Sequence, residues 1–169
     1  MTTPTNRTSL YRQFVERFRP ATSGCRVVSV TPGDIDAAES VLGCALPTSY
    51  RTFVTEVGAG DNDVPDNPRF MVAEIWQPEL IVRQVKDEWW APIPPILTCK
   101  EAIASDVAWK HLTPFASEQS HGFWFCFPHA LARSDDAPVF YFNHDGGDIE
   151  PVADGFDHMI QRILAGQND

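Results

Sequence analysis

The chain has 169 residues, 43% of them hydrophobic, and a formal net charge of -10. This length and composition fit one globular domain, residues 1–169, with a sizeable core. The acidic balance disfavours direct nucleic-acid binding, because phosphate contacts need clustered Lys and Arg, and it favours a basic partner. The charge is uneven: residues 1–60 carry six basic and five acidic side chains, whereas residues 61–169 carry seven and eighteen.

The sequence shows no targeting or membrane segment. Its N-terminus has no apolar run typical of a signal peptide, and no stretch approaches the roughly 20 apolar residues of a membrane helix. The cysteines show no CxxC pair, which is typical of reduced and mostly buried thiols. They are Cys25, Cys44, Cys99 and Cys126. We therefore expect a cytoplasmic protein that does not enter a membrane.

The N-terminal third predicts a helix followed by a short strand. Residues 1–8 are polar and are expected to fray. Ser9 is placed to cap a helix with an apolar stripe that ends before Pro20, and Arg26–Val30 is a candidate strand. Three arginines on this helix are interpreted as a solvated face rather than a nucleic-acid arm. They are Arg12, Arg17 and Arg19.

Val30 to Gly60 predicts two short helices joined by a tight turn. Thr31 is placed as N-cap of the first helix, Asp34 completes a capping box, and Gly43 ends the helix. The second helix begins near Pro47 and has apolar residues at the i, i+3, i+4 and i+7 positions. These residues are Tyr50, Phe53, Val54 and Val57, followed by Gly58.

The middle of the chain is less regular. Gly60–Pro68 holds three Asp, two Asn and two Pro residues and is expected to be an exposed loop. Arg69–Ile75 predicts a strand, and Pro78 starts a helix running to about Trp90, with Val82, Val85 and Trp89 on one face. The remainder of 76–111 contains a proline-interrupted segment and a second capping box. We expect residues 76–111 to elaborate the core. One of Trp89 and Trp90 is a candidate interface anchor, with core packing as the alternative.

The last third predicts a meander of strands and a final helix. The expected strands are Leu112–Ala116, Gly122–Phe127, Pro138–Asn143 and Ile149–Val152, with a hairpin turn at His144–Asp148. Asp154 is expected to cap the helix. Its apolar stripe consists of Phe156, Met159, Ile160, Ile163 and Leu164, followed by Gly166.

Two sets of residues resemble the SUKH superfamily. The first is Ala38-Glu39, Leu42-Gly43, Leu46-Pro47, Tyr50 and Phe53. The second is Pro114-Phe115-Ala116-Ser117-Glu118, Phe123–Phe127, Val139 through Asp145, and Val152-Ala153 with Phe156. The resemblance implies an α+β fold, a single domain in which a mainly antiparallel sheet is flanked by helices. It also implies a protein that binds rather than catalyses. The superfamily includes immunity proteins of bacterial polymorphic toxin systems and fungal regulators of cell-wall synthesis.

The sequence offers little catalytic chemistry. No Walker loop, GxSxG elbow, HExxH or GxGxxG motif is present. One candidate zinc cluster lacks the standard ligand spacings, so we expect no metal. It is His121, Cys126, His129 and His144. His144, Asp145 and Asp148 suggest an acid/base group, but hairpin-turn chemistry is the better interpretation. We therefore expect no catalytic residue, no cofactor and no enzymatic activity.

The acidic residues are the predicted partner-binding groups. Residues 113–157 hold eight acidic side chains against one basic, Arg133. The predicted binding residues are Asp61, Asp63, Asp66, Glu118, Asp145 and Asp148, with an ordinary solvated face as the alternative. The leading hypothesis is an immunity protein that neutralises a cognate basic toxin domain, for example one acting on nucleic acid. The alternative is an intracellular regulatory or scaffold module. The sequence leaves the toxin and the oligomeric state open.

Overall fold

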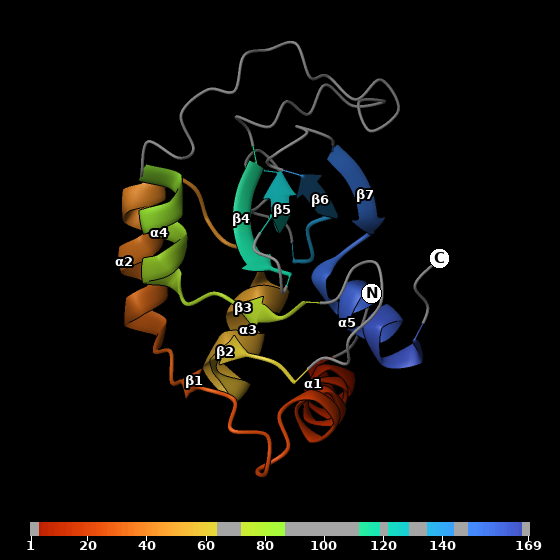
Figure 1. Ribbon diagram of the computed structural model, residues 1–169. Coiled ribbons are helices and arrows are strands. Elements are labelled where there is room, and N and C mark those ends of the chain that lie inside the picture. The colour runs from red at the N-terminus through yellow and green to blue at the C-terminus, as the bar shows by residue number, and fades with distance from the viewer. Residues whose placement is uncertain are drawn as a thin grey trace.

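The computed structural model describes residues 4–63, 72–86, 112–118, 122–128, 135–143 and 149–166 (Figure 1). Within these ranges the chain has an α+β fold, as predicted. The helices are α1 (Pro4–Phe18), α2 (Pro32–Leu42), α3 (Thr48–Val57), α4 (Pro78–Lys86) and α5 (Phe156–Ala165). The strands are β1 (Val27–Val28), β2 (Ala59–Asp61), β3 (Glu74–Ile75), β4 (Leu112–Ser117), β5 (Phe123–Pro128), β6 (Val139–Asn143) and β7 (Ile149–Ala153).

The strands form one antiparallel sheet in chain order, from β1 at one edge to β7 at the other. β4, β5 and β6 are its centre, and their aromatic side chains are almost all buried. This explains why the sequence shows a continuous aromatic run rather than an alternating pattern. β1, β2 and β3 are only two or three residues long, so this end of the sheet depends on contacts outside the strand ladder.

Helices α1, α3 and α5 pack together beside the sheet (Figure 1). Tyr50 of α3 contacts Phe115 and Phe127 edge to face, and these two rings stack on each other with centroids 4.0 Å apart. Phe156 of α5 contacts Phe115 edge to face and Phe127 at a tilt. All four side chains are fully buried. Burial of one such side chain is worth about 1.5–3 kcal/mol. This aromatic cluster therefore holds α3 and α5 against the centre of the sheet.

Helices α2 and α4 lie side by side, and α4 also runs against β4 (Figure 1). The predicted capping box of α2 is present: Asp34 donates its backbone N–H to the Thr31 hydroxyl and accepts the Thr31 N–H. Gly43 ends α2 in the left-handed conformation, as predicted. Arg51 of α3 forms ion pairs with both Asp36 and Glu39 of α2, and these two pairs join the two helices.

The first helix differs from the prediction. It begins at Pro4 rather than after Ser9, so residues 4–8 are helical and not frayed. The interpretation of its arginines as a solvated face is wrong for Arg19, which is only 8% exposed. Arg17 donates to the Leu164 carbonyl and lies over the Phe18 ring. Guanidinium groups bind aromatic rings and backbone carbonyl groups. The hydrophobic periodicity of the sequence gives no information about such contacts.

Three further expectations need correction. Gly60 and Asp61 belong to β2, not to a loop, because Gly60 pairs with Val27 and Ile75. The buried face of α4 centres on Pro78 and Ile81, whereas Val82 and Val85 are only partly buried. The N-cap of α5 is Gly155 and not Asp154. The predicted strand residues 69–71, the elements proposed between 87 and 111 and the 144–148 hairpin turn lie outside the described residues.

Candidate protein-binding surface

Strand β1 is the exposed end of the sheet. It pairs with β2 through Val27–Gly60 and Val28–Ala59, and no described strand pairs with its other side. Gly60 is required here, since its φ is +136° and an added Cβ would lie 2.0 Å from the Arg26 carbonyl oxygen. The close approach of the two backbones places β1 as a short, exposed edge.

A buried arginine, Arg19, holds β2 in place through hydrogen bonds. Arg19 donates its Nε–H to Asn62 Oδ1 over 2.7 Å and also donates to the carbonyls of Gly58 and Gly60. Asn62 in turn donates to the Val72 carbonyl. Burial lowers the pKa of Arg19 to about 10, so it stays protonated at neutral pH. Asp61 therefore stands on a rigid strand, next to a buried and fully bonded residue.

A buried tryptophan, Trp76, fixes the chain where β3 leads into α4. Trp76 donates its N–H to the Phe115 carbonyl over 2.8 Å and accepts the Tyr50 hydroxyl at its own carbonyl over 2.5 Å. Its indole N–H donates to the Ser117 hydroxyl, and its ring contacts Trp124 edge to face. These bonds fix the chain where β3 turns into α4, and so they fix the first residues of α4 that face solvent.

Two adjoining hollows lie between these anchored elements. One, of about 330 Å³, is bounded by β1, β2, β3 and α4, and the other, of about 500 Å³, by β1, α2 and α4. Val28, Gln77 and Glu79 line both hollows, so the two meet along β1 and the start of α4. We call the two hollows together with the outer side of β1 the edge surface. Figure 1 shows β1 and the α2–α4 pair, which border this surface.

The edge surface combines apolar side chains with acidic ones. The large hydrophobic residues exposed in the described part of the chain are Val27, Val28 and Val41, at 43%, 37% and 48%. Val28 and Val41 line the hollows. The charged lining residues are Asp34, Asp61, Glu74 and Glu79 on the acidic side, and Arg26 and Arg83 on the basic side. Exposed aliphatic groups bordered by charge are typical of protein-interaction sites.

The structure describes three of the six predicted binding residues. Asp61 lines the smaller hollow, accepts a hydrogen bond from the Arg26 N–H, and is exposed. Asp63 is exposed just beyond it. Glu118 directly follows β4, is half-buried and accepts a hydrogen bond from the Tyr141 hydroxyl. Only strand β3 lies between β4 and the strand β2 that carries Asp61. Asp66, Asp145 and Asp148 lie outside the described residues. The binding role of all six stays a prediction.

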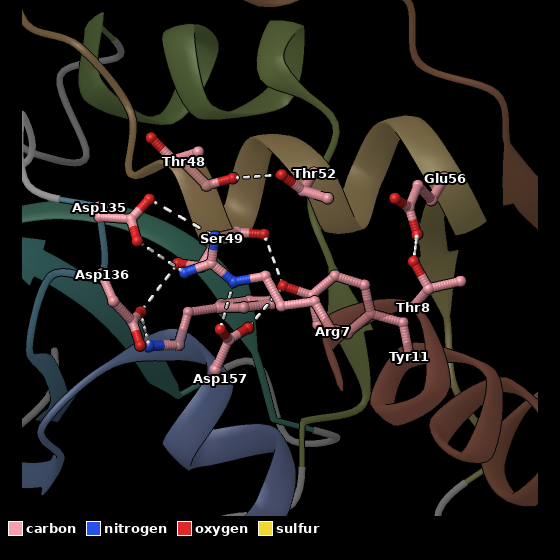
Figure 2. Close-up of polar contacts among 11 residues, drawn as sticks. Arg7, Thr8, Tyr11, Thr48, Ser49, Thr52, Glu56, Asp135, Asp136 and Asp157 are labelled. Atoms are coloured by element: carbon pink, nitrogen blue, oxygen red, sulfur yellow. Dashed lines mark hydrogen bonds and ion pairs between the residues drawn. The ribbon is translucent and has the colours of Figure 1, made fainter. Parts of the chain in front are cut away.

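A second concentration of charge lies where α1, α3 and α5 meet (Figure 2). Asp157 is 1% exposed and accepts the Arg7 Nε–H over 2.6 Å and the Tyr11 hydroxyl over 2.5 Å. Arg7 also bonds the Asp135 carboxylate over 3.1 Å. Although burial alone lowers the pKa of Arg7, these carboxylates raise it above its ordinary value. We call this cluster, with Ser49 and Asp136, the polar clamp.

Asp136 completes the polar clamp by capping α5. Its Oδ1 accepts the Phe156 N–H over 2.6 Å and the Ser49 hydroxyl over 2.8 Å. The cap therefore comes from a distant carboxylate, which is why the nearby Asp154 is not needed. An added Cβ on Gly155 would lie 2.1 Å from Asp136 Oδ2, so a glycine fits here. Burial, and then the negative charge of Asp157, raise the pKa of Asp136.

The polar clamp is internally satisfied. In the described residues, every fully buried side-chain nitrogen or oxygen has a hydrogen-bond partner. Three of the eight acidic residues in 113–157 thus make hydrogen bonds within the fold. They are Asp135, Asp136 and Asp157. One pattern in the sequence could have indicated the polar clamp. Arg7 and Tyr11 are four residues apart, so a charged group and a hydroxyl group share one face of the helix.

The candidate metal ligands are only partly described. Cys126 is fully buried in β5, and burial raises the pKa of its thiol well above the ordinary value. The three histidines of the proposed cluster, and Cys99, Trp89 and Trp90, lie outside the described residues. Among the described residues, no group of three or more His, Cys, Asp or Glu side chains is arranged to hold a metal ion. In the same residues, no helix has the length and apolar character needed to cross a membrane.

Comparison with known families decides the classification. The SMI1 / KNR4 family (SUKH-1) matches residues 29–162, which is most of the chain. This protein belongs to the SMI1 / KNR4 family (SUKH-1). The match begins at residue 29, directly after β1, and ends inside α5. It therefore contains α2, α4 and the carboxylates Asp135, Asp136 and Asp157 of the polar clamp, while β1 and α1 with Arg7 and Tyr11 precede it. No curated protein matches the chain. Family membership confirms the resemblance and the α+β fold that it implied, and it points to a protein partner in general terms.

Proposed function

We propose that this SUKH-1 protein is a cytoplasmic immunity protein of a bacterial polymorphic toxin system. It binds a cognate basic toxin domain and blocks it by occupying its working surface, without catalysing a reaction itself. The observation that carries the proposal is the edge surface. It exposes the aliphatic side chains of Val27, Val28 and Val41 beside four acidic side chains.

The charge of the chain supports a basic partner. The formal net charge is -10, and residues 61–169 carry all of the negative excess. Opposite charge on two proteins speeds their diffusional encounter and mainly affects the association rate. A toxin that acts on nucleic acid presents a basic surface to a polyanion. An acidic inhibitor meets the same surface and competes with that substrate.

Cell survival tests the proposal. The toxin domain encoded beside the gene for this protein is expressed with and without the protein, at matched protein levels. Protection supports an immunity function. Failure of the folded protein to protect, or the lack of any neighbouring toxin gene, contradicts it and favours the regulatory alternative. His144→Ala should protect as well as the unmodified protein, whereas loss of protection in that variant alone would favour catalysis.

A further inference from the structure

The outer side of β1 carries backbone groups oriented for another strand. Asp61 donates its N–H to the Arg26 carbonyl over 3.0 Å, so Arg26 directs its backbone groups toward β2. In an antiparallel ladder, successive residues alternate between facing the neighbouring strand and facing away from it. Val27 therefore presents its N–H and C=O groups to the free edge, while Val28 pairs with Ala59.

Side-chain positions along this edge suit an extended segment. The Val28 side chain lines both hollows, and Val41 of α2 and Val82 of α4 line the larger one. Side chains of an added strand alternate between two faces, so every second residue would reach these hollows. Val27 lies over Gly58, whose φ is +84° and whose added Cβ would be 2.6 Å from Val27 Cγ1. Contact with Gly58 keeps β1 in place.

The charged side chains of the edge surface favour one kind of extended segment. Asp61 and Glu79 are exposed at the hollows, and Asp34 adds a third carboxylate, against Arg26 and Arg83. A second copy of this chain would bring the same acidic groups and another net charge of -10 to the interface. Like charges facing each other oppose association, so this surface disfavours self-pairing and fits a partner with Lys or Arg beside apolar residues.

We infer that the edge surface binds an extended segment of the toxin, which adds to β1 as an eighth strand. The segment has alternating apolar and basic side chains: the apolar ones enter the hollows beside Val28 and Val41, and the basic ones meet Asp61 and Glu79. Backbone hydrogen bonds to Val27 supply affinity, and the hollows supply specificity. This inference rests on the proposed function, and it names the partner surface and the mode of binding.

Val27→Pro tests the backbone contact directly. Proline removes the outward N–H of residue 27 and leaves the bonds between β1 and β2 intact, since edge strands accept proline where the N–H faces outward. Val27→Thr is the matched control, because it keeps both the N–H and the branched shape. Binding to the toxin domain identified by the survival experiment is measured by calorimetry, with circular dichroism as a check that both variants are folded.

The expected result is about a tenfold weaker affinity for Val27→Pro, the loss of one hydrogen bond plus poorer fit, and little change for Val27→Thr. Hydrogen exchange adds a readout that does not depend on substitution. The peptide containing Val27 should exchange quickly in the free protein and slowly in the complex. If the unmodified protein binds the toxin while that peptide stays unprotected and Val27→Pro binds normally, edge docking is wrong and the immunity function stands.

Self-pairing is checked with the free protein. Sedimentation at increasing protein concentration should show a monomer, and an associating species that Val27→Pro disrupts would assign the edge to a second copy and overturn the inference. If the unmodified protein does not bind or neutralise the toxin at all, the proposed function fails, and the edge inference fails with it.

Discussion

The polar clamp and the edge surface use similar residue types in opposite ways. In the polar clamp, Asp157 is buried and each of its oxygens accepts a hydrogen bond from within the chain. In the edge surface, Asp61 and Glu79 are exposed on elements that Asn62 and Trp76 fix from inside. Removing a buried charge partner is costly, whereas changing an exposed charge is not. The number of acidic residues in a sequence therefore does not indicate a binding surface unless the burial of each residue is also known.

The largest expected effect comes from opening the polar clamp. Asp157→Ala leaves the Arg7 guanidinium buried without its closest carboxylate, 2.6 Å away, and leaves the Tyr11 hydroxyl without its shorter bond. We expect a loss of about 3–5 kcal/mol of unfolding free energy, measured by urea denaturation. Asp154→Ala, at a fully exposed position of the same region, is the control and should change stability by less than about 0.5 kcal/mol. Equal effects would mean that the polar clamp does not hold the fold.

A backbone change at the edge should cost less. Gly60→Ala places a Cβ 2.0 Å from the Arg26 carbonyl at a φ of +136°, so β1 must move away from β2. We expect a loss on the order of 1–3 kcal/mol together with weaker toxin binding. Gly33→Ala, inside α2 where the nearest atom is 3.7 Å away, should be neutral or stabilising by up to about 1 kcal/mol. Thermal melting of both variants makes the comparison, and similar melting temperatures would show that the β1–β2 approach is not constrained.

The pH dependence of the polar clamp gives a smaller effect. Asp136 has a raised pKa in the folded protein, first through burial and then through Asp157, so the folded state binds its proton more tightly than the unfolded state does. Stability contributed by this group is therefore present below the ordinary aspartate pKa of about 4 and is lost as the pH rises through the folded value. Asp136→Asn keeps an acceptor for Phe156 and Ser49 but cannot ionise. Its unfolding free energy should gain on that of the unmodified protein as the pH rises from about 4, and a constant difference would contradict this assignment.

The local elements could be predicted from the sequence better than the placement of charge. Thr31 and Asp34 form the predicted capping box, because a cap depends on residues three apart. The α5 cap was missed, because Asp136 reaches Phe156 from a segment twenty residues earlier. The sequence predicts a solvated Arg19, since nothing near it in the chain indicates that Asn62 and the end of α3 surround it.

The edge surface could be predicted from the sequence even less well than the placement of charge. Strand β1 was expected, but its role as an open edge follows from the sheet order, which is a property of the whole chain. The larger hollow lies between β1, α2 and α4, and α2 and α4 are far apart in the sequence but lie side by side in the fold. The sequence predicts Asp61 as a binding residue from its charge alone, and the structure adds the exposed Val28 in the same hollow.

The most direct test of the central claim is the rate at which the toxin domain associates with charge variants at low and high salt. Glu79→Lys reverses an exposed charge in the edge surface, and Glu16→Lys reverses an exposed charge on α1, so both should keep the stability of the unmodified protein to within about 0.5 kcal/mol. At low salt we expect association of Glu79→Lys to be several-fold slower, dissociation to be little changed, and added salt to reduce the difference, while Glu16→Lys stays close to the unmodified protein. Equal slowing by both substitutions, or by neither, would contradict the claim that the edge surface meets the partner.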